Sequence, residues 1–128
     1  MATWDDVRRV AQALPQTEEG TTFGNLSWKV NGKGFVWERP LRPADIAALG
    51  QASPGGPILG VRTENLVAKD ALLSGGSDAI FSTPHFEGYP AVLVQLDRVQ
   101  PAELQELIEE AWLACAPKRV ARAYLDAR

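Results

Sequence analysis

The sequence predicts an α+β fold, in which an antiparallel sheet is covered on one face by the N- and C-terminal helices. Three observations lead to this prediction. Apolar residues recur at helical spacing near both ends of the chain, over residues 3–14 and 101–115. Strand-like segments dominate the sequence between them, and the pair Asn31-Gly32 separates two of these segments as a hairpin turn would. With 128 residues the chain has the size of one domain, so we expect a single domain over 1–128.

The first helix is expected from about residue 3 to residue 14. Thr3 is a favourable N-cap, and acidic side chains follow it in the first turn, where the helix dipole favours negative charge. Pro15 ends the apolar stripe, because proline cannot continue a helix interior.

A hairpin is expected next, with its turn at Asn31-Gly32. A type I′ turn needs positive φ at both central residues, and this residue pair supplies it. The turn sets a register that pairs Val30 with Lys33, Trp28 with Phe35, and Leu26 with Trp37. In that register Trp28, Phe35 and Trp37 share one face of the sheet. We interpret these rings as core, and the alternative is a base-stacking platform.

The middle of the chain is expected to contain two helices and a short strand. Pro43 to Leu49 suits a short helix with Ile46 and Leu49 turned inward, and Ile58 to Val61 suits a strand. Glu64 to Leu73 suits a second helix. Its apolar side would consist of Leu66, Val67, Ala71 and Leu73.

Two further strands and two helices are expected in the remaining sequence. The strands are Ala79 to Thr83 and Ala91 to Leu96, and the second is apolar enough for a central position in the sheet. The loop from Pro84 to Pro90 joins them. Pro101 to Cys115 is the clearest amphipathic helix in the chain, and Pro117 suits the first turn of a final helix. The inner side of that last helix would consist of Val120, Ala123 and Tyr124.

Several of these segments together resemble a known family of small bacterial proteins. The first helix ends in "ALP", and the segments "WKVNGKGFVW", "GVRTENLVAKDALL", "FSTPHFEGYPAVLVQL" and "AWLACAPKRVA" follow in this order. In this order they are similar to the MmcQ/YjbR family, and the similarity spans nearly the whole chain. The motifs are structural rather than chemical.

The resemblance implies a fold of the CyaY or frataxin type and an ability to bind DNA through two hairpin "wings". The segments Leu26 to Arg39 and Ile80 to Leu96 match the places where the wings would lie. No catalytic residues are associated with the family, so none are assigned here. We therefore expect a binding protein rather than an enzyme.

The charge distribution supplies candidates for DNA contact. The net charge is −3, but the cations Lys29, Lys33, Arg39 and Arg42 gather within and just after the first wing, where they could contact phosphates. His85 and Phe86 would form the tip of the second wing. With so few cations, the predicted binding is weak and sensitive to salt. The alternative interpretation of these four cations is an ordinary solvated hairpin, in which edge lysines also prevent strands of different molecules from pairing.

A second hypothesis belongs to a different functional class. The 84–90 loop and the basic hairpin could enclose a groove for a small anionic or flat aromatic ligand, or for a protein partner. A concave pocket lined by aromatic rings at His85 would favour this hypothesis, whereas a flat surface there would favour DNA.

Other kinds of chemistry lack support in the sequence. One histidine and one cysteine do not make a metal site, and His85 has no neighbouring groups that would make it a general base, so we predict no metal, no cofactor and no catalytic residue. Cys115 lies on the apolar side of its helix and is expected to be buried. The sequence contains neither a signal peptide nor a membrane-spanning segment, so we expect a cytoplasmic protein.

Overall fold

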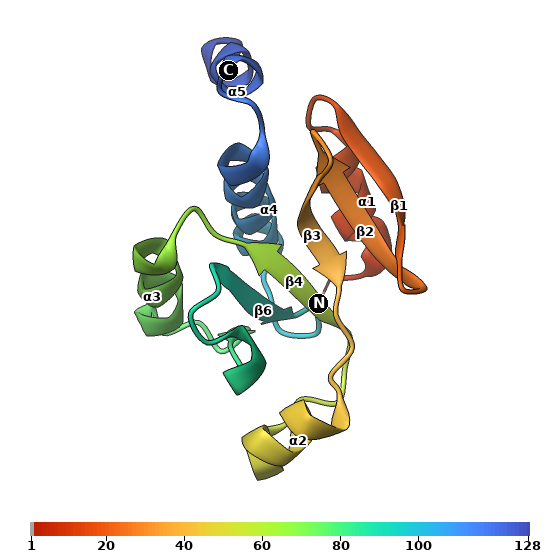
Figure 1. The fold of residues 1–128 in the computed structure, drawn as a ribbon, viewed down its shortest axis with the longest axis vertical. Coiled ribbons are helices and arrows are strands. Elements are labelled where there is room, and N and C mark those ends of the chain that lie inside the picture. Colours follow the sequence, from red (N-terminus) through yellow and green to blue (C-terminus); the bar gives the residue numbers. More distant parts are fainter. Residues whose placement is uncertain (1) are drawn as a thin grey trace.

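The computed structural model describes residues 2–128 and shows an α+β fold, which confirms the predicted class (Figure 1). Its strands form one six-stranded sheet in the order β1-β2-β3-β4-β6-β5, with every neighbouring pair antiparallel. The strands are β1 (Thr17–Thr22), β2 (Asn25–Val30), β3 (Lys33–Glu38), β4 (Ile58–Arg62), β5 (Ile80–Phe81) and β6 (Ala91–Gln95). The α-helices are α1 (Trp4–Gln12), α2 (Pro43–Leu49), α3 (Leu66–Ser74), α4 (Pro101–Cys115) and α5 (Lys118–Asp126).

The helices α1 and α4 cover one face of the sheet, as the sequence predicts. They lie behind the sheet in Figure 1, with α4 against β3 and β4 and α1 beside β1. A capping box begins α1, because the Thr3 hydroxyl accepts from the Asp6 amide and the Asp6 carboxylate accepts from the Thr3 amide. The expected burial of β6 is also confirmed, but its position is not central, since it lies between β4 and the short edge strand β5.

The main core lies between this face and the two helices. Trp28, Phe35 and Trp112 are fully buried there, so the core assignment of Trp28 and Phe35 is confirmed. Each buried indole has a hydrogen-bond acceptor. The Trp28 N–H donates to the Glu19 carboxylate over 2.9 Å, and the Trp112 N–H donates to the Pro15 carbonyl over 3.0 Å.

The predicted register of the hairpin is correct only next to its turn. Val30 pairs with Lys33 as expected, but beyond Lys29 the pairing shifts, so that Val36 lies opposite Trp28 and Trp37 lies opposite Ser27. The predicted pairs Trp28 with Phe35 and Leu26 with Trp37 are therefore wrong. Between Gly34 and Val36, β3 contains one residue more than β2, which is the arrangement of a β-bulge.

The bulge places Trp37 on the opposite side of the sheet from Trp28. Phe35 and Val36 are both fully buried in the main core, and the alternation resumes with Trp37 facing away from it. Trp37 is half-buried and packs against a second, smaller apolar cluster. The buried members of that cluster are Ile58, Phe86, Ala91 and Leu93. We call this side of the sheet, which faces away from α1 and α4, the open face.

The helices α2, α3 and α5 are present, but their inner sides differ from the prediction. Ile46 of α2 is 48% exposed and its neighbour Asp45 is buried. In α3, the predicted apolar side is largely exposed, with Val67 at 77%, and the buried residue is Lys69. In α5, Val120 is buried but Ala123 is exposed. The first two deviations have one cause, since Asp45 and Lys69 make internal polar contacts that periodicity alone does not reveal.

The turn between β2 and β3 gives a test of the local structure. Asn31 and Gly32 have φ values of 52° and 75°. Replacement of Gly32 by alanine should lower the free energy of unfolding by about 1 kcal/mol, because a side chain is disfavoured at positive φ even where there is space. Urea denaturation measures the change. Gly20→Ala in the edge strand β1 is the control, since that residue has an ordinary φ and open space around it, and a similar loss there would contradict the explanation.

Candidate functional site

The centre of the open face is the indole of Trp37. The pairing places Ser27, Trp37, Gly60 and Leu93 in one row across β2, β3, β4 and β6. The indole covers Gly60, because a Cβ atom built there would lie only 2.3 Å from Trp37 Cε2. Glycine at this position thus allows an aromatic ring to lie against the strand while part of it stays exposed.

A tyrosine and an arginine stand beside the indole on the same face. Arg62 lies two residues after Gly60 on β4, and its guanidinium carbon is 5.3 Å from the ring centre of Tyr89. Tyr89 is 44% exposed. Lys29 is exposed on the side of β2 that carries Ser27, so it belongs to the same face. The open face therefore combines accessible aromatic rings with cations.

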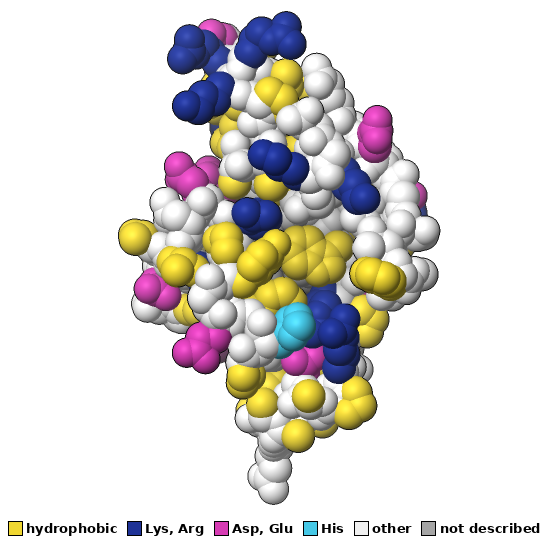
Figure 2. Space-filling view, viewed as in Figure 1, with side chains coloured by type: hydrophobic (Ala, Val, Ile, Leu, Met, Phe, Trp, Pro, Cys, Tyr) yellow, Lys and Arg dark blue, Asp and Glu magenta, His cyan; other side chains and the backbone are white. Residues whose placement is uncertain are grey.

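Cationic side chains extend well beyond this centre. Figure 2 shows the open face, where Lys and Arg side chains spread from the C-terminal helix down to the histidine, while most acidic side chains lie towards the edges. Among the exposed cations are Lys118, Arg119 and Arg122 of α5. The overall charge of −3 thus conceals a strong local asymmetry.

The loop after β5 is fastened to α3 by the buried Lys69. Its ammonium group donates to the carbonyl of Phe86 and, over 2.8 Å, to the carbonyl of Tyr89. Lys69 is only 5% exposed. Burial lowers the pKa of Lys69, and the negative charges of Asp70 and Glu87 oppose that effect. The two carbonyl contacts fix the position from which Tyr89 reaches the open face.

Two of the six predicted contact residues lie in the interior. Arg39 is 6% exposed and forms an ion pair with the buried Asp45, with 3.0 Å between Nη2 and Oδ2. Its guanidinium carbon also lies 5.2 Å from the ring centre of Phe86, which is itself 6% exposed. These contacts join the two predicted wings at their bases, so Arg39 and Phe86 are not available to a ligand.

The pKa of Asp45 reflects this internal site. Burial of the carboxylate by itself raises its pKa. The hydrogen bond from the Arg42 amide and the positive charge of Arg39 outweigh that effect, and the pKa of Asp45 is lower than its ordinary value. The carboxylate is therefore ionised and serves as the counter-charge of Arg39.

The other four predicted residues are exposed but do not form one patch. Lys29 and Lys33 lie near the turn of the first hairpin, and the register assigns Lys33 to the face covered by α4. Arg42 precedes α2, and His85 lies in a short 3₁₀ segment with its ring 4.9 Å from that of Phe86. The predicted contact residues are therefore scattered, whereas Trp37, Tyr89 and Arg62 lie together on the open face.

Sequence reasoning missed Arg62 and Tyr89 and placed Trp37 in the main core. One signal in the sequence was available, because a glycine inside a strand often marks the close approach of another group. Gly60 is such a residue, but the sequence does not say which side chain approaches it.

Metal-ligating side chains are spread out in the described part of the chain, and the single thiol is buried. Within residues 2–128, no three His, Cys, Asp or Glu side chains lie close enough together to hold a metal ion. The expected burial of Cys115 is confirmed, and burial raises the pKa of its thiol despite the positive charges of Arg62 and Lys33. No helix within the described residues is both long and apolar enough to cross a membrane.

The wider comparison identifies relatives across almost the whole length of the chain. The family model named YjbR matches residues 12–114. Uncharacterized proteins of Mycobacterium tuberculosis (Rv2570) and Mycobacterium bovis (Mb2600) are each 47% identical over 128 residues, covering 98% of this chain and 97% of theirs.

A solved structure shows the same fold. The crystal structure of the Deinococcus radiodurans protein DR2400, which carries the family-model domain DUF419, is 24% identical to this chain and superposes with a TM-score of 0.66. The match covers 98% of this chain and 89% of that one.

The contact between Trp37 and Gly60 can be tested by a double-mutant cycle. Gly60→Ala should lower the free energy of unfolding by about 1–3 kcal/mol, because the new methyl group forces the indole off the strand. In a Trp37→Ala background the same change should cost much less. Urea denaturation of the four proteins measures the coupling, and an equal cost in both backgrounds would show that the indole does not lie over Gly60.

The buried ion pair predicts a pH-dependent loss of stability. Asp45→Asn should lower the free energy of unfolding at neutral pH by about 3 kcal/mol, because Arg39 keeps its charge without a partner. The folded pKa of Asp45 lies below its unfolded value, so its contribution is complete above about pH 4 and is lost as the pH falls through the folded pKa. The difference between wild type and variant should therefore shrink in acid.

Urea denaturation between about pH 7 and pH 3 measures this effect. Asp5→Asn is the matched control, since the Asp5 side chain is 90% exposed and its pairing with Arg8 is at the surface. A difference between wild type and Asp45→Asn that stays constant down to pH 3 would contradict the assignment.

Proposed function

Because the chain belongs to the YjbR family and presents aromatic rings and cations on the open face, we propose that it is a non-enzymatic, cytoplasmic protein that binds single-stranded DNA. The observation that carries this proposal is the partly exposed indole of Trp37 over Gly60, flanked by Lys29 and Arg62. The resemblance to the family led us to expect DNA, and the geometry favours the sheet surface over the wing tips as the place of contact.

Stacking is the reason for preferring a single strand. Each base of a single strand offers a flat ring, and stacking on an aromatic side chain contributes about 1–3 kcal/mol per base. Trp37 and Tyr89 both expose ring surface on the open face. In a duplex the bases are already stacked on each other, so these rings would meet only the backbone.

Electrostatics supports the same face. Lys29 and Arg62 lie beside the rings, and Arg42 precedes α2, which contacts the 3₁₀ segment of the 84–90 loop, so a strand across this surface would pass several positive groups. With about three phosphates neutralised, the logarithm of the binding constant should fall with the logarithm of salt concentration with a slope of about −2. Binding should thus be weak and sensitive to salt.

A ligand-binding module remains the second candidate. The same rings could hold a single flat aromatic anion such as a mononucleotide. The groove expected between the 84–90 loop and the basic hairpin has little support, because Arg39 and Phe86 already contact each other there. His85 lines none of three clefts of about 320 to 470 Å³ found within residues 2–128.

Fluorescence anisotropy with a labelled oligonucleotide of about 15 thymidines tests the proposal. We expect tighter binding to the single strand than to a duplex of equal length, and a marked loss of affinity between about 50 mM and 200 mM salt. Trp37→Leu should weaken single-strand binding by about fivefold or more, since it removes one stacking surface. Lys29→Ala should reduce the salt dependence.

Arg9→Ala provides the matched control. Arg9 is an exposed cation on α1, on the covered side of the sheet, so its removal should leave binding unchanged. No association with either form of DNA at low salt would reject the proposal, as would an equal loss in the Arg9 and Lys29 variants. Complete competition by single thymidine mononucleotides at similar concentration would favour the second candidate.

A further inference from the structure

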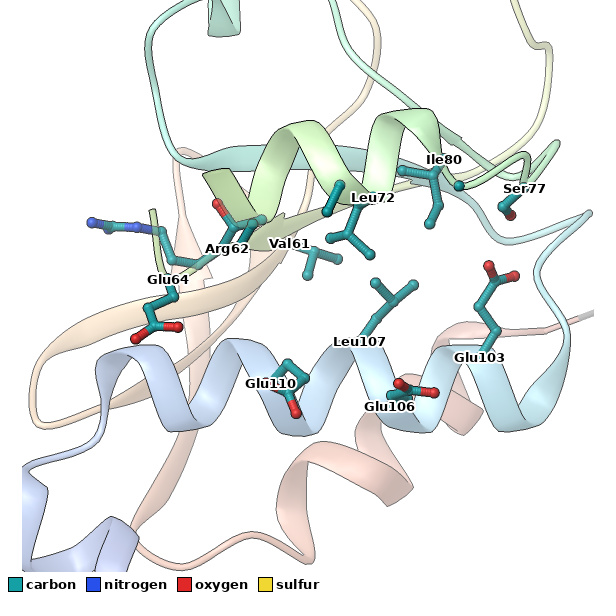
Figure 3. Close-up of a pocket in the computed structure, with 14 residues that line it drawn as sticks. Val61, Arg62, Glu64, Leu72, Ser77, Ile80, Glu103, Glu106, Leu107 and Glu110 are labelled. Carbon is teal, nitrogen blue, oxygen red and sulfur yellow. The ribbon is translucent and has the colours of Figure 1, made fainter. Parts of the chain in front are cut away.

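A cleft between α3 and α4 shares only Arg62 with the proposed DNA contacts. Its volume is about 440 Å³, which is within the range of small-molecule sites. Figure 3 shows Leu72 of α3 and Leu107 of α4 pointing towards each other across it, with Val61 and Ile80 beside them. Ala68 and Ala71 of α3 also line it. We call it the α3–α4 cleft.

The cleft exists because the two helices pack on different parts of the sheet. α3 packs against β5 and β6, whereas α4 packs against β3 and β4 on the covered face. A wedge is left between them, and short side chains at Ala68 and Ala71 do not fill it. Leu72 and Ile80 stay only partly buried as a result. An apolar group placed between the helices would remove this surface from water.

The rim of the cleft is strongly acidic. Three glutamates of α4 line it, Glu103, Glu106 and Glu110, and Glu64 stands at one end (Figure 3). Within residues 2–128, the ion pairs closer than 4.0 Å include none of these four carboxylates. The α4 glutamates are three, four and seven positions apart, so like charges lie next to each other on one side of the helix.

Arg62 is the one cation among the lining residues, and it does not neutralise this rim. Its guanidinium carbon lies 5.3 Å from the Tyr89 ring centre, and its Nη1 lies 3.5 Å from the Tyr89 hydroxyl. Arg62 is therefore engaged on the side of the open face. The mouth of the cleft is negative, and the floor is apolar.

We propose that the α3–α4 cleft binds a small molecule with an apolar or aromatic body and a protonated amine. The body would lie against Leu72, Ile80 and Leu107, and the ammonium group would meet the glutamates of α4. A bound cation would also relieve the repulsion between these carboxylates. This ligand is opposite in charge to DNA, so the site is a second one and does not extend the open face.

Three ligands with the same ring system provide the test. Tryptamine, tryptophol and indole-3-propionate share an indole body and carry a positive, a neutral and a negative end group. Titration of the isotope-labelled protein, followed by NMR, reports both affinity and location. We expect tryptamine to bind about fivefold more tightly than tryptophol, indole-3-propionate to bind most weakly, and the shifts to centre on Leu72, Ile80 and Leu107.

Variants separate the two parts of the site. The double substitution Glu106→Gln and Glu110→Gln should weaken tryptamine about fivefold and leave tryptophol unchanged. Ala71→Phe should abolish binding of both ligands by filling the cleft, and Ala71 is exposed, so the fold tolerates the larger ring. Glu18→Gln on the edge strand β1 is the control and should change nothing.

Three results would overturn the proposal. They are equal affinity for the three ligands, shifts that centre on Trp37 and Tyr89 instead of the cleft, and saturable binding of a basic peptide without any binding of tryptamine. None of the cleft substitutions changes Trp37 or Lys29. If the cleft proposal is rejected, the DNA-binding measurements are therefore unaffected.

Discussion

The single extra residue in β3 is the constraint on which the arrangement of this molecule depends. A regular hairpin would keep the large rings of β2 and β3 on one side, and the open face would then lack an aromatic centre. Because Phe35 and Val36 both turn towards the main core, Trp37 is carried to the other side. There the indole lies over Gly60, which has no side chain to obstruct it, and packs against the second apolar cluster.

Buried charged side chains fix the 84–90 loop at the edge of the open face. Arg39 pairs with Asp45 beneath Phe86, and Lys69 donates to two carbonyls of the 84–90 loop. Such groups are costly to remove from water, so they are stable only where each finds a partner of good geometry. The backbone of the 84–90 loop is therefore fixed by hydrogen bonds at two carbonyls, and this fixes the position of Tyr89 on the open face.

The charged side chains of the protein gather on two surfaces of opposite sign. Lysines and arginines gather around the rings of the open face, while the glutamates of α4 border an apolar cleft. The net charge of −3 is the sum over the whole chain, so it does not reveal the positive surface or the negative one. A polyanion and an organic cation could each approach its own surface without competing, because the two sites share only Arg62, which is turned towards Tyr89.

The sequence by itself determined the elements and their class. Proline and N-cap residues mark where α1 and α4 begin, the Asn31-Gly32 pair marks the turn, and the apolar run of β6 marks a strand buried in the interior of the sheet, because these signals act within a few residues. The similarity to the MmcQ/YjbR family was also visible in short segments, and the family model confirms it.

Only the tertiary structure decided the side of the sheet that Trp37 occupies and the burial of Arg39 and Lys69. The sequence suggests that Arg39 is a surface cation, but in the fold it is buried beside Asp45. The sequence likewise places Lys69 on the solvent side of α3, but in the fold the 84–90 loop packs against its ammonium group. The bulge has only a weak local signal in Gly34, because a glycine inside a strand often marks a bulge but does not say which way the following side chains turn. The spacing of apolar residues and the choice of turn residues are local properties of the sequence. The partner of a buried charge and the register beyond a bulge depend on segments far apart in the chain.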